Sequence, residues 1–292
     1  MRLKTIFTIF VALFIISACS TSKVTTSLRN DAETLASGGD YSAAVTRWEH
    51  YFMQTPVEDV AGTDFATAAN TAFKAEDYTK ATQWFDQARY KNYGDAEMYL
   101  TLAEIYRRQQ NISKEMGALE TYSEKFVADD PAVNARLFAL NVDIGSMEEA
   151  KRYWTLMDES ARSEEENLVD YLSLSKKLGD NAAADSVATE IIAGNPNQFD
   201  ALEWLAKKYY WAGQNRYKRE MAKYEQNKTR KQYKLLLAEL ETVTGDFKKA
   251  LPYLEKLWEQ KPGKEYAAYF ANIYARFGDK KKADFYSNYS GN

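Results

Sequence analysis

The chain has 292 residues but only one cysteine, one histidine, five prolines and 13 glycines. A single cysteine excludes an intramolecular disulfide and a cysteine-rich metal site, and a single histidine excludes a metal site built on paired imidazoles. The scarcity of proline and glycine argues against long irregular segments. The chain also has no glycine-rich phosphate loop and no Gly-x-Ser-x-Gly elbow. We therefore expect no metal, no cofactor and no enzymatic activity.

The remaining candidates for chemistry are the single histidine, His50, and the acidic run at residues 164–166. His50 falls near the end of a predicted helix, and we interpret it as structural. Acidic side chains in the first turn of a helix are favoured by the helix dipole, so the acidic run is interpreted as a solvated helix start.

The amino terminus combines two cations with a short apolar run. Arg2 and Lys4 precede an 11-residue stretch, 6–16, that only Thr8 interrupts. As a helix this stretch measures roughly 16 Å, and a bilayer core needs about 20 residues. A charged start followed by a short apolar run is typical of a secretory signal peptide.

The end of this segment, Ile16-Ser17-Ala18-Cys19, resembles the lipobox of bacterial lipoproteins. The resemblance implies cleavage before Cys19 and lipidation of that cysteine, so that residues 1–18 are a signal peptide. Two or three acyl chains give lasting attachment to a membrane. Residues 19–27 then comprise the lipidated cysteine and a small, polar, flexible tether.

Two features of the mature chain bear on its location and partners. Ser20 follows the cysteine with no acidic residue close behind, and by resemblance to enteric lipoproteins this indicates the outer membrane. The lack of an acidic run also differs from the surface-export tag of some Bacteroidota lipoproteins, which favours the periplasmic side. Removing Arg2 and Lys4 leaves a formal charge of about −6, which disfavours generic binding to nucleic acid or to anionic lipid surfaces.

A repeated pattern fills the rest of the sequence. The stretches GGDYSAAVTRW (38–48), AEDYTKATQWF (75–85), TGDFKKALPYL (244–254) and FGDKKKADFYS (277–287) share a turn, an aspartate and then an alanine. The positions that directly follow the turn are Tyr41, Tyr78, Ile112, Met147, Asn181, Asn215, Phe247 and Lys280. They are 32 to 37 residues apart, which indicates a helical solenoid.

This pattern resembles the tetratricopeptide (TPR) repeat, a helix–turn–helix unit of 34 residues. Alanines at the family's second-helix position are Ala44, Ala81, Ala150, Ala184, Ala250 and Ala283. The resemblance implies an all-α, right-handed superhelical solenoid of about eight helix pairs over residues 28–292. Glycines where the first helix of a pair ends, expected as left-handed caps, are Gly145, Gly179, Gly213, Gly245 and Gly278.

In TPR proteins, ligands usually lie in a groove lined by the first helix of each pair. The basic and aromatic residues that we assign to this groove are Arg107, Arg108, Lys176, Lys177, Trp204, Lys207, Tyr210, Trp211 and Arg276. One interpretation is a partner-binding stripe for an extended peptide with acidic or aromatic side chains. The alternative is that the cations complement helix carboxyl ends.

These inferences predict a lipid-anchored envelope scaffold that binds other envelope proteins or extended peptide segments. It could be a subunit of an outer-membrane assembly or secretion complex. The alternatives left open are an adaptor for peptidoglycan enzymes, and a glycan-binding or enzymatic lipoprotein. Lipidation at Cys19 provides the predicted membrane contact, and no nucleic-acid partner is expected.

Overall fold

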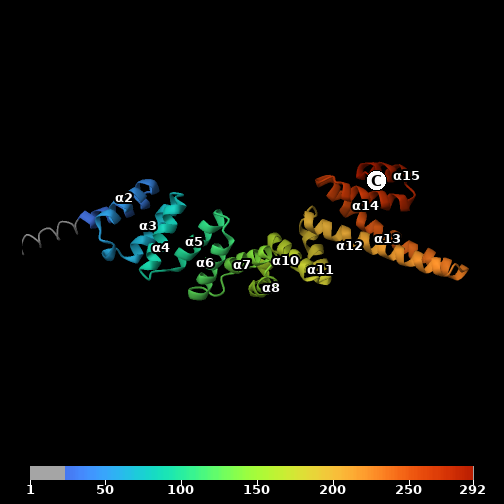
Figure 1. Cartoon of the computed structure of the whole chain (residues 1–292), viewed down its shortest axis with the longest axis horizontal. Coiled ribbons are helices and arrows are strands. Elements are labelled where there is room, and N and C mark those ends of the chain that lie inside the picture. Colours follow the sequence, from blue (N-terminus) through green and yellow to red (C-terminus); the bar gives the residue numbers. More distant parts are fainter. Residues whose placement is uncertain (1–23, 292) are drawn as a thin grey trace, which may run out of the picture. The chain divides into compact units, whose positions relative to one another are not determined.

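The computed structural model describes residues 24–291, and every regular element among them is a helix (Figure 1). Residues 24–37 are helical and are followed by α2 (Tyr41–Gln54), η1 (Val57–Asp59), α3 (Gly62–Lys74), α4 (Tyr78–Tyr90), α5 (Ala96–Arg108), α6 (Ile112–Lys125), α7 (Pro131–Ile144), α8 (Met147–Leu156), α9 (Glu159–Arg162), α10 (Glu165–Leu178), α11 (Asn181–Gly194), α12 (Phe199–Gln226), α13 (Arg230–Gln260), α14 (Lys264–Phe277) and α15 (Lys280–Ser290). The fold class is an all-α helical solenoid. No helix within the described range is long and apolar enough to cross a membrane.

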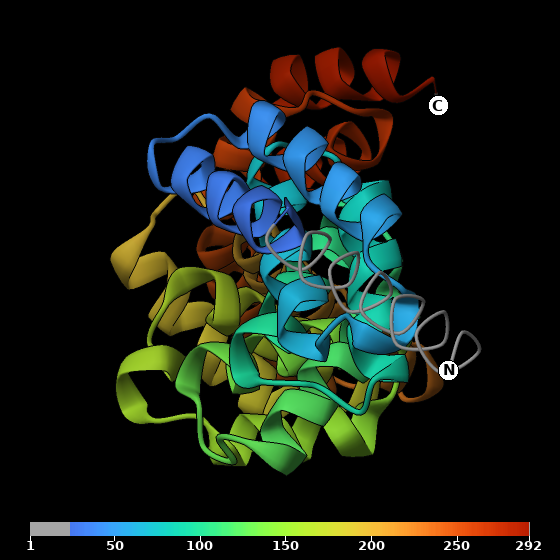
Figure 2. The ribbon, with the colours of Figure 1, turned by 90° about the vertical axis from the view of Figure 1, so that its left-hand side faces the viewer.

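The chain divides into two compact units, Met1–Val133 and Asn134–Asn292. In the first unit, α3 packs on α4 and α5 packs on α6. In the second unit, the pairs are α10 with α11, α12 with α13, and α14 with α15. The last pair, in red, can be followed in Figure 2, where α14 and α15 lie side by side.

The repeated aspartate of the sequence pattern starts the second helix of a pair. Six of the eight marker positions are the first residues of α2, α4, α6, α8, α11 and α15. Before five of these helices, the side chain of an Asp or Asn accepts a hydrogen bond from a backbone N–H of the first turn; these residues are Asp40, Asp77, Asn111, Asp180 and Asp279. Such a cap stabilises a helix by about 1 kcal/mol.

The alanines of the pattern lie at helix crossings, as predicted. All six are buried, with at most 8% of their surface exposed. Two helices approach closely where side chains are small, and the bulky neighbours fill the space between pairs. In the second unit, Phe247, Leu257, Phe270 and Tyr274 belong to one continuous core that joins the last four helices. No single pair could bury these apolar faces alone.

Three of the five predicted glycine caps are confirmed. Gly145, Gly179 and Gly278 have φ values of 79°, 71° and 77°, in the region where a Cβ is disfavoured. The predictions for Gly213 and Gly245 are wrong, because both glycines lie inside long helices: α12 has 28 residues and α13 has 31. Together with the helix of residues 24–37 and α2, and with α7 and α8, the five pairs above make seven successive helix pairs over residues 24–291, not eight.

The missing turn at Gly213 has a packing explanation. Gly213 lets α12 approach α13, because a Cβ at this position would lie 3.2 Å from the buried ring of Phe247 and 3.3 Å from Cβ of Asp246. Asp246 does not cap a helix; it faces Arg216 of α12 at 3.5 Å. The residue in the cap position after Gly213 is Gln214, which is not among the preferred N-cap residues.

The N-terminal predictions are only partly within the described residues. The signal peptide, Cys19 and the first part of the tether lie outside them. Residues 24–27 were predicted to be flexible tether, but they are helical and continue into the helix that ends at residue 37. The tether prediction is therefore wrong for these four residues.

Candidate functional site

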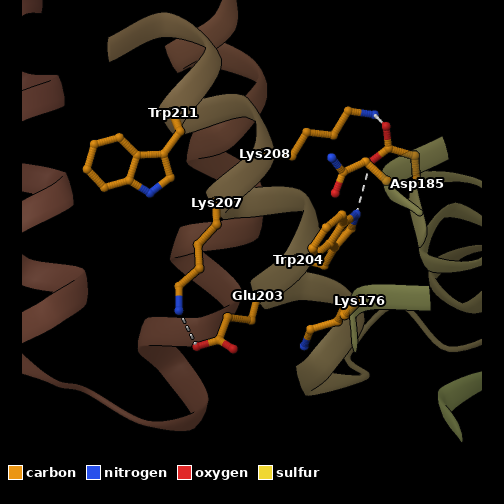
Figure 3. Close-up of a pocket in the computed structure, with 8 residues that line it drawn as sticks. Lys176, Asp185, Glu203, Trp204, Lys207, Lys208 and Trp211 are labelled. Carbon is orange, nitrogen blue, oxygen red and sulfur yellow. Dashed lines mark hydrogen bonds and ion pairs between the residues drawn. The ribbon is translucent and has the colours of Figure 1, made fainter. Parts of the chain in front are cut away.

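A pocket of 490 Å³ lies in the second unit, beside the first half of α12 (Figure 3). It is lined by Lys176, Asn181, Asp185, Glu203, Trp204, Lys207, Lys208 and Trp211. Five of these residues come from α12: Glu203 and the residues one, four, five and eight positions after it. These spacings place them on one helical face. The end of α10 contributes Lys176, and the start of α11 contributes Asn181 and Asp185. The volume is within the range of small-ligand sites.

Asp185 fixes one wall of the pocket. Its Oδ1 accepts a hydrogen bond from the indole Nε1 of Trp204 at 2.9 Å, and its Oδ2 pairs with Nζ of Lys208 at 2.8 Å. Both bonds join α11 to α12 (Figure 3). Because the polar edge of Trp204 is satisfied within the chain, the apolar face of its indole is the part that a ligand would contact.

Lys207 lies one turn further along α12 and is held by two carboxylates. Its Nζ is 3.0 Å from Oε1 of Glu203 and 3.1 Å from Oε1 of Glu265, which belongs to α14. Burial lowers the pKa of Lys207, but the two carboxylates outweigh this and leave the pKa above its ordinary value. Glu203 also accepts a hydrogen bond from the hydroxyl of Tyr266 at 3.1 Å. This network ties the pocket to α14 and keeps Lys207 charged.

Lys176 is the pocket cation that has no hydrogen bond or ion pair among residues 24–291. It lies in the last turn of α10 and its side chain is exposed. Its positive charge is one of the causes that lower the pKa of Glu203, after the larger effects of burial, which raises that pKa, and of Lys207 and Tyr266, which lower it. The Lys176 ammonium can therefore be offered to an anionic group without breaking an existing pair.

Trp211 forms the upper end of the pocket wall and is 43% exposed. Its ring makes edge contacts with Tyr210 at 5.2 Å and with Tyr269 at 6.4 Å, measured between ring centroids. The two tyrosine rings thus pack against the indole. Figure 3 shows Trp211, Lys207 and Trp204 following one another along α12. The arrangement can accept an apolar or aromatic group between indoles and an anionic group at Lys176.

The structure thus brings together four of the nine predicted groove residues: Lys176, Trp204, Lys207 and Trp211. It also corrects one assignment. Tyr210 is only 5% exposed and packs in the core, and its hydroxyl accepts a hydrogen bond from Nδ2 of Asn272 at 2.6 Å. It points inwards because it lies on the face of α12 that packs on Phe247.

Two of the predicted groove cations outside the pocket have partners within the second unit. Lys177 donates to the backbone carbonyl of Val142 near the end of α7, at 2.7 Å. The guanidinium of Arg276 lies 3.5 Å from the ring centroid of Tyr217 and hydrogen-bonds to Asn272 and Gln214.

The other two cations belong to the first unit. Arg108 pairs with Glu104 at 2.8 Å and donates to the hydroxyl of Tyr78 at 3.2 Å. Arg107, next to it in the last turn of α5, is exposed. The structure therefore does not place these arginines in the pocket.

The sequence interpretation missed Asn181, Asp185, Glu203 and Lys208. The helical spacing from Trp204 and Lys207 could have identified Glu203 and Lys208, since Glu203 precedes Lys207 by four residues, Lys208 follows Trp204 by four, and residues four apart lie on one helical face. Asp185 follows the crossing alanine Ala184, and only the packing of α11 on α12 gives it its role. No cluster of possible metal ligands occurs within the described residues.

Comparisons with known proteins establish the fold. No protein-family model and no curated protein sequence matches the chain. Among solved structures, the C-terminal part of a TPR repeat-containing protein from Cytophaga hutchinsonii is similar at 13% identity and a TM-score of 0.51, over 90% of this chain and 93% of that one. A Bacteroides ovatus protein whose suggested role is protein binding matches at 15% identity and a TM-score of 0.51, over 75% of this chain and 99% of the other. The architecture is that of TPR-repeat solenoids.

Proposed function

We propose that this chain is an adaptor of the bacterial envelope that binds an extended segment of a partner protein in the pocket beside α12. The observation that carries the proposal is the pocket itself, where an uncompensated ammonium, Lys176, and an indole that is 43% exposed, Trp211, share one cavity. Solenoids of stacked helix pairs commonly use such extended surfaces to bind proteins. The TPR-like fold supports protein partners over small substrates only by analogy.

The pocket favours a particular kind of segment. Three lysines and two carboxylates line it, but Lys207 and Lys208 are already paired with Glu203 and Asp185. One cation is therefore left for the ligand. A peptide with an acidic side chain next to an aromatic or large aliphatic one fits this chemistry, because the carboxylate would meet Lys176 while the apolar group stacks on an indole.

The lipid anchor is the second part of the proposal and rests on the sequence around Cys19. We expect Cys19→Ala to abolish the incorporation of labelled palmitate and to leave an uncleaved precursor. Labelling that persists in the variant would contradict lipidation at this position. By resemblance, the anchored protein would lie at the outer membrane and face the periplasm.

The binding proposal is tested with two adjacent lysines. Lys176→Glu should weaken the affinity for the captured partner. Trp211→Ala should lower this affinity by about 30-fold or more, since truncating an aromatic anchor that is buried in the complex often costs at least about 2 kcal/mol. Lys177→Glu is the matched control: it should lower stability, because Lys177 bonds to the Val142 carbonyl, and leave affinity unchanged. Partners would be captured from detergent-solubilised membranes, and both affinity and melting temperature would be measured for each variant.

The result also separates the two kinds of partner. Capture of outer-membrane β-barrel proteins supports a role in an assembly or secretion complex, whereas capture of peptidoglycan hydrolases supports an adaptor for those enzymes. If Lys176→Glu and Trp211→Ala both bind partners as the unmodified chain does, the pocket is not the binding site.

A further inference from the structure

The far end of the α12–α13 hairpin is a distinct surface. We define the hairpin tip as residues 218–237. Figure 1 shows this end of the hairpin projecting beyond the helices that pack against its base. From Glu225 to Lys231 every side chain is exposed. The pocket residues of α12 all precede Gly213, so the tip and the pocket are separate sites.

The hairpin tip concentrates positive charge in an acidic protein. It contains seven basic and two acidic residues, a formal charge of +5. The whole chain carries −4, so all other residues together carry −9. A segregation of this size creates a strongly positive local potential that attracts an anionic surface.

Internal pairing does not neutralise the tip. Glu220 accepts from both Arg219 and Lys223, and Glu225 pairs with Lys228 at 2.7 Å. Both acidic side chains of the tip are thereby used. The four cations of the tip without an ion pair among residues 24–291 are Lys218, Arg230, Lys231 and Lys234.

Large apolar side chains are exposed beside these cations. Tyr233, Leu235 and Leu237 are 47%, 52% and 46% exposed, whereas Leu236 is buried against the hairpin. Consecutive residues on a helix point in directions about 100° apart. Leu236 therefore packs inside the hairpin, while Leu235 and Leu237 lie on either side of it. Tyr224 of α12 contacts Tyr233 with ring centroids 5.8 Å apart, which adds a second aromatic group to the same end.

We propose that the hairpin tip docks on an anionic phospholipid surface. Helices with Lys and Arg among exposed Leu and aromatic side chains bind the interface of a bilayer, where the apolar groups enter the boundary and the long cationic side chains reach the headgroups. Clusters of four to eight basic residues on such helices recognise anionic lipids. A nucleic acid would account for the cations but would leave the two exposed leucines without a role.

The inference stands on residues that take no part in the pocket or at Cys19. Its failure would leave the proposed adaptor function untouched, and the reverse also holds. The docked tip would give the protein a contact with lipid that does not need acylation.

The experiment uses the mature chain, residues 19–292, with Cys19→Ser so that no acyl chain contributes. Binding to vesicles of phosphatidylethanolamine with phosphatidylglycerol is compared with binding to phosphatidylcholine vesicles by co-sedimentation. Binding is expected only to the anionic vesicles. Changing Lys218, Arg230, Lys231 and Lys234 to Gln should weaken it by about 100-fold or more, since each basic residue near such a surface contributes about fivefold. High salt should weaken it as well.

A charge-matched control changes four exposed lysines outside the tip, Lys125, Lys151, Lys261 and Lys281, to Gln. This variant should bind anionic vesicles as the unsubstituted chain does. Leu235→Ser with Leu237→Ser should weaken binding and abolish the part that survives high salt. Circular dichroism checks that every variant keeps its helicity.

Three results would overturn the proposal. One is the absence of binding to anionic vesicles. Another is an equal loss in the tip variant and its charge-matched control. The third is tip-dependent binding to heparin, a soluble polyanion, with none to vesicles, which would instead identify a site for an acidic macromolecule.

Discussion

Replacing Gly213 and Gly245 by alanine should change stability in opposite directions, although both glycines lie inside the same helical hairpin. A Cβ at Gly245 would meet no atom within 4 Å beyond its own helix, whereas a Cβ at Gly213 would lie 3.2 Å from Phe247 and 3.3 Å from Asp246. Phe247 is fully buried, so its ring has little room to move. The same substitution therefore meets open space at one position and a packed ring at the other.

The magnitudes follow from two competing effects. Alanine is favoured over glycine in a helix interior by about 0.8–1 kcal/mol, and Gly245→Ala should gain most of this. Gly213→Ala gains the same amount but overpacks the crossing, which typically costs about 1–3 kcal/mol. The net effect at Gly213 should be a loss of about 1 kcal/mol. In melting temperature, each kcal/mol corresponds to about 2–4 °C for a domain of comparable size.

The assay is thermal and urea unfolding, with hydrogen exchange of peptides from α12 and α13 to localise the change. Gly179→Ala serves as a reference for a true helix end, because Gly179 has φ of 71° and an alanine there should cost about 1–2 kcal/mol. If Gly245→Ala destabilises the chain as Gly179→Ala does, residue 245 adopts a left-handed turn and the continuous α13 is wrong.

Two further predictions concern the second unit. Burial raises the pKa of Asp170 to about 6, and the charges of Asp143 and Glu166 add to the shift; the folded state then holds a proton that the unfolded chain has released, so this group should make stability fall as pH rises from about 4 to about 6. Asp170→Asn should remove that fall and stabilise the protein at pH 7 by roughly 1–2 kcal/mol, with allowance for its partial exposure, as measured by urea unfolding across that range; an unchanged pH profile would contradict the shift. Ala250→Trp should destabilise the hairpin by about 1–3 kcal/mol, because Ala250 is fully buried at a crossing, and an unchanged melting curve would contradict that placement.

The helix starts were predictable because the signals that set them are local. An aspartate such as Asp77 or Asp180 accepts from an amide only three residues away, so the sequence pattern contains the whole interaction. The crossing alanines were predictable for a related reason, since their spacing from the cap is constant. The repeat count was not, because the fusion at Gly213 depends on Phe247, which is 34 residues distant in sequence and contacts that glycine only through tertiary packing.

Half of the pocket residues were predictable, because their spacing along one helix is a local signal. Trp204, Lys207 and Trp211 share a face of one helix, and helical periodicity places them together. The residues that fix them in position, Asp185 and Glu265, come from other helices. Tyr210 was misplaced because the resemblance to the repeat family assigned it to the groove, whereas it lies on the face of α12 that packs on Phe247.

The length of α12 also bears on the two interpretations of the basic stripe. Cations stabilise a helix end only within its last turn, and Lys177 fits that explanation, since it reaches the carbonyl of Val142 near the end of α7. Lys207 does not, because α12 continues for 19 residues beyond it to Gln226. The carboxyl end of α12 is therefore remote from Lys207 and Trp211, and Lys207 is instead held by carboxylates from α12 and α14. The fusion of two repeats into one helix thus removes the helix-end explanation for Lys207, whereas Lys176, in the last turn of α10, still fits it. Binding remains the interpretation that accounts for an indole left exposed in the pocket.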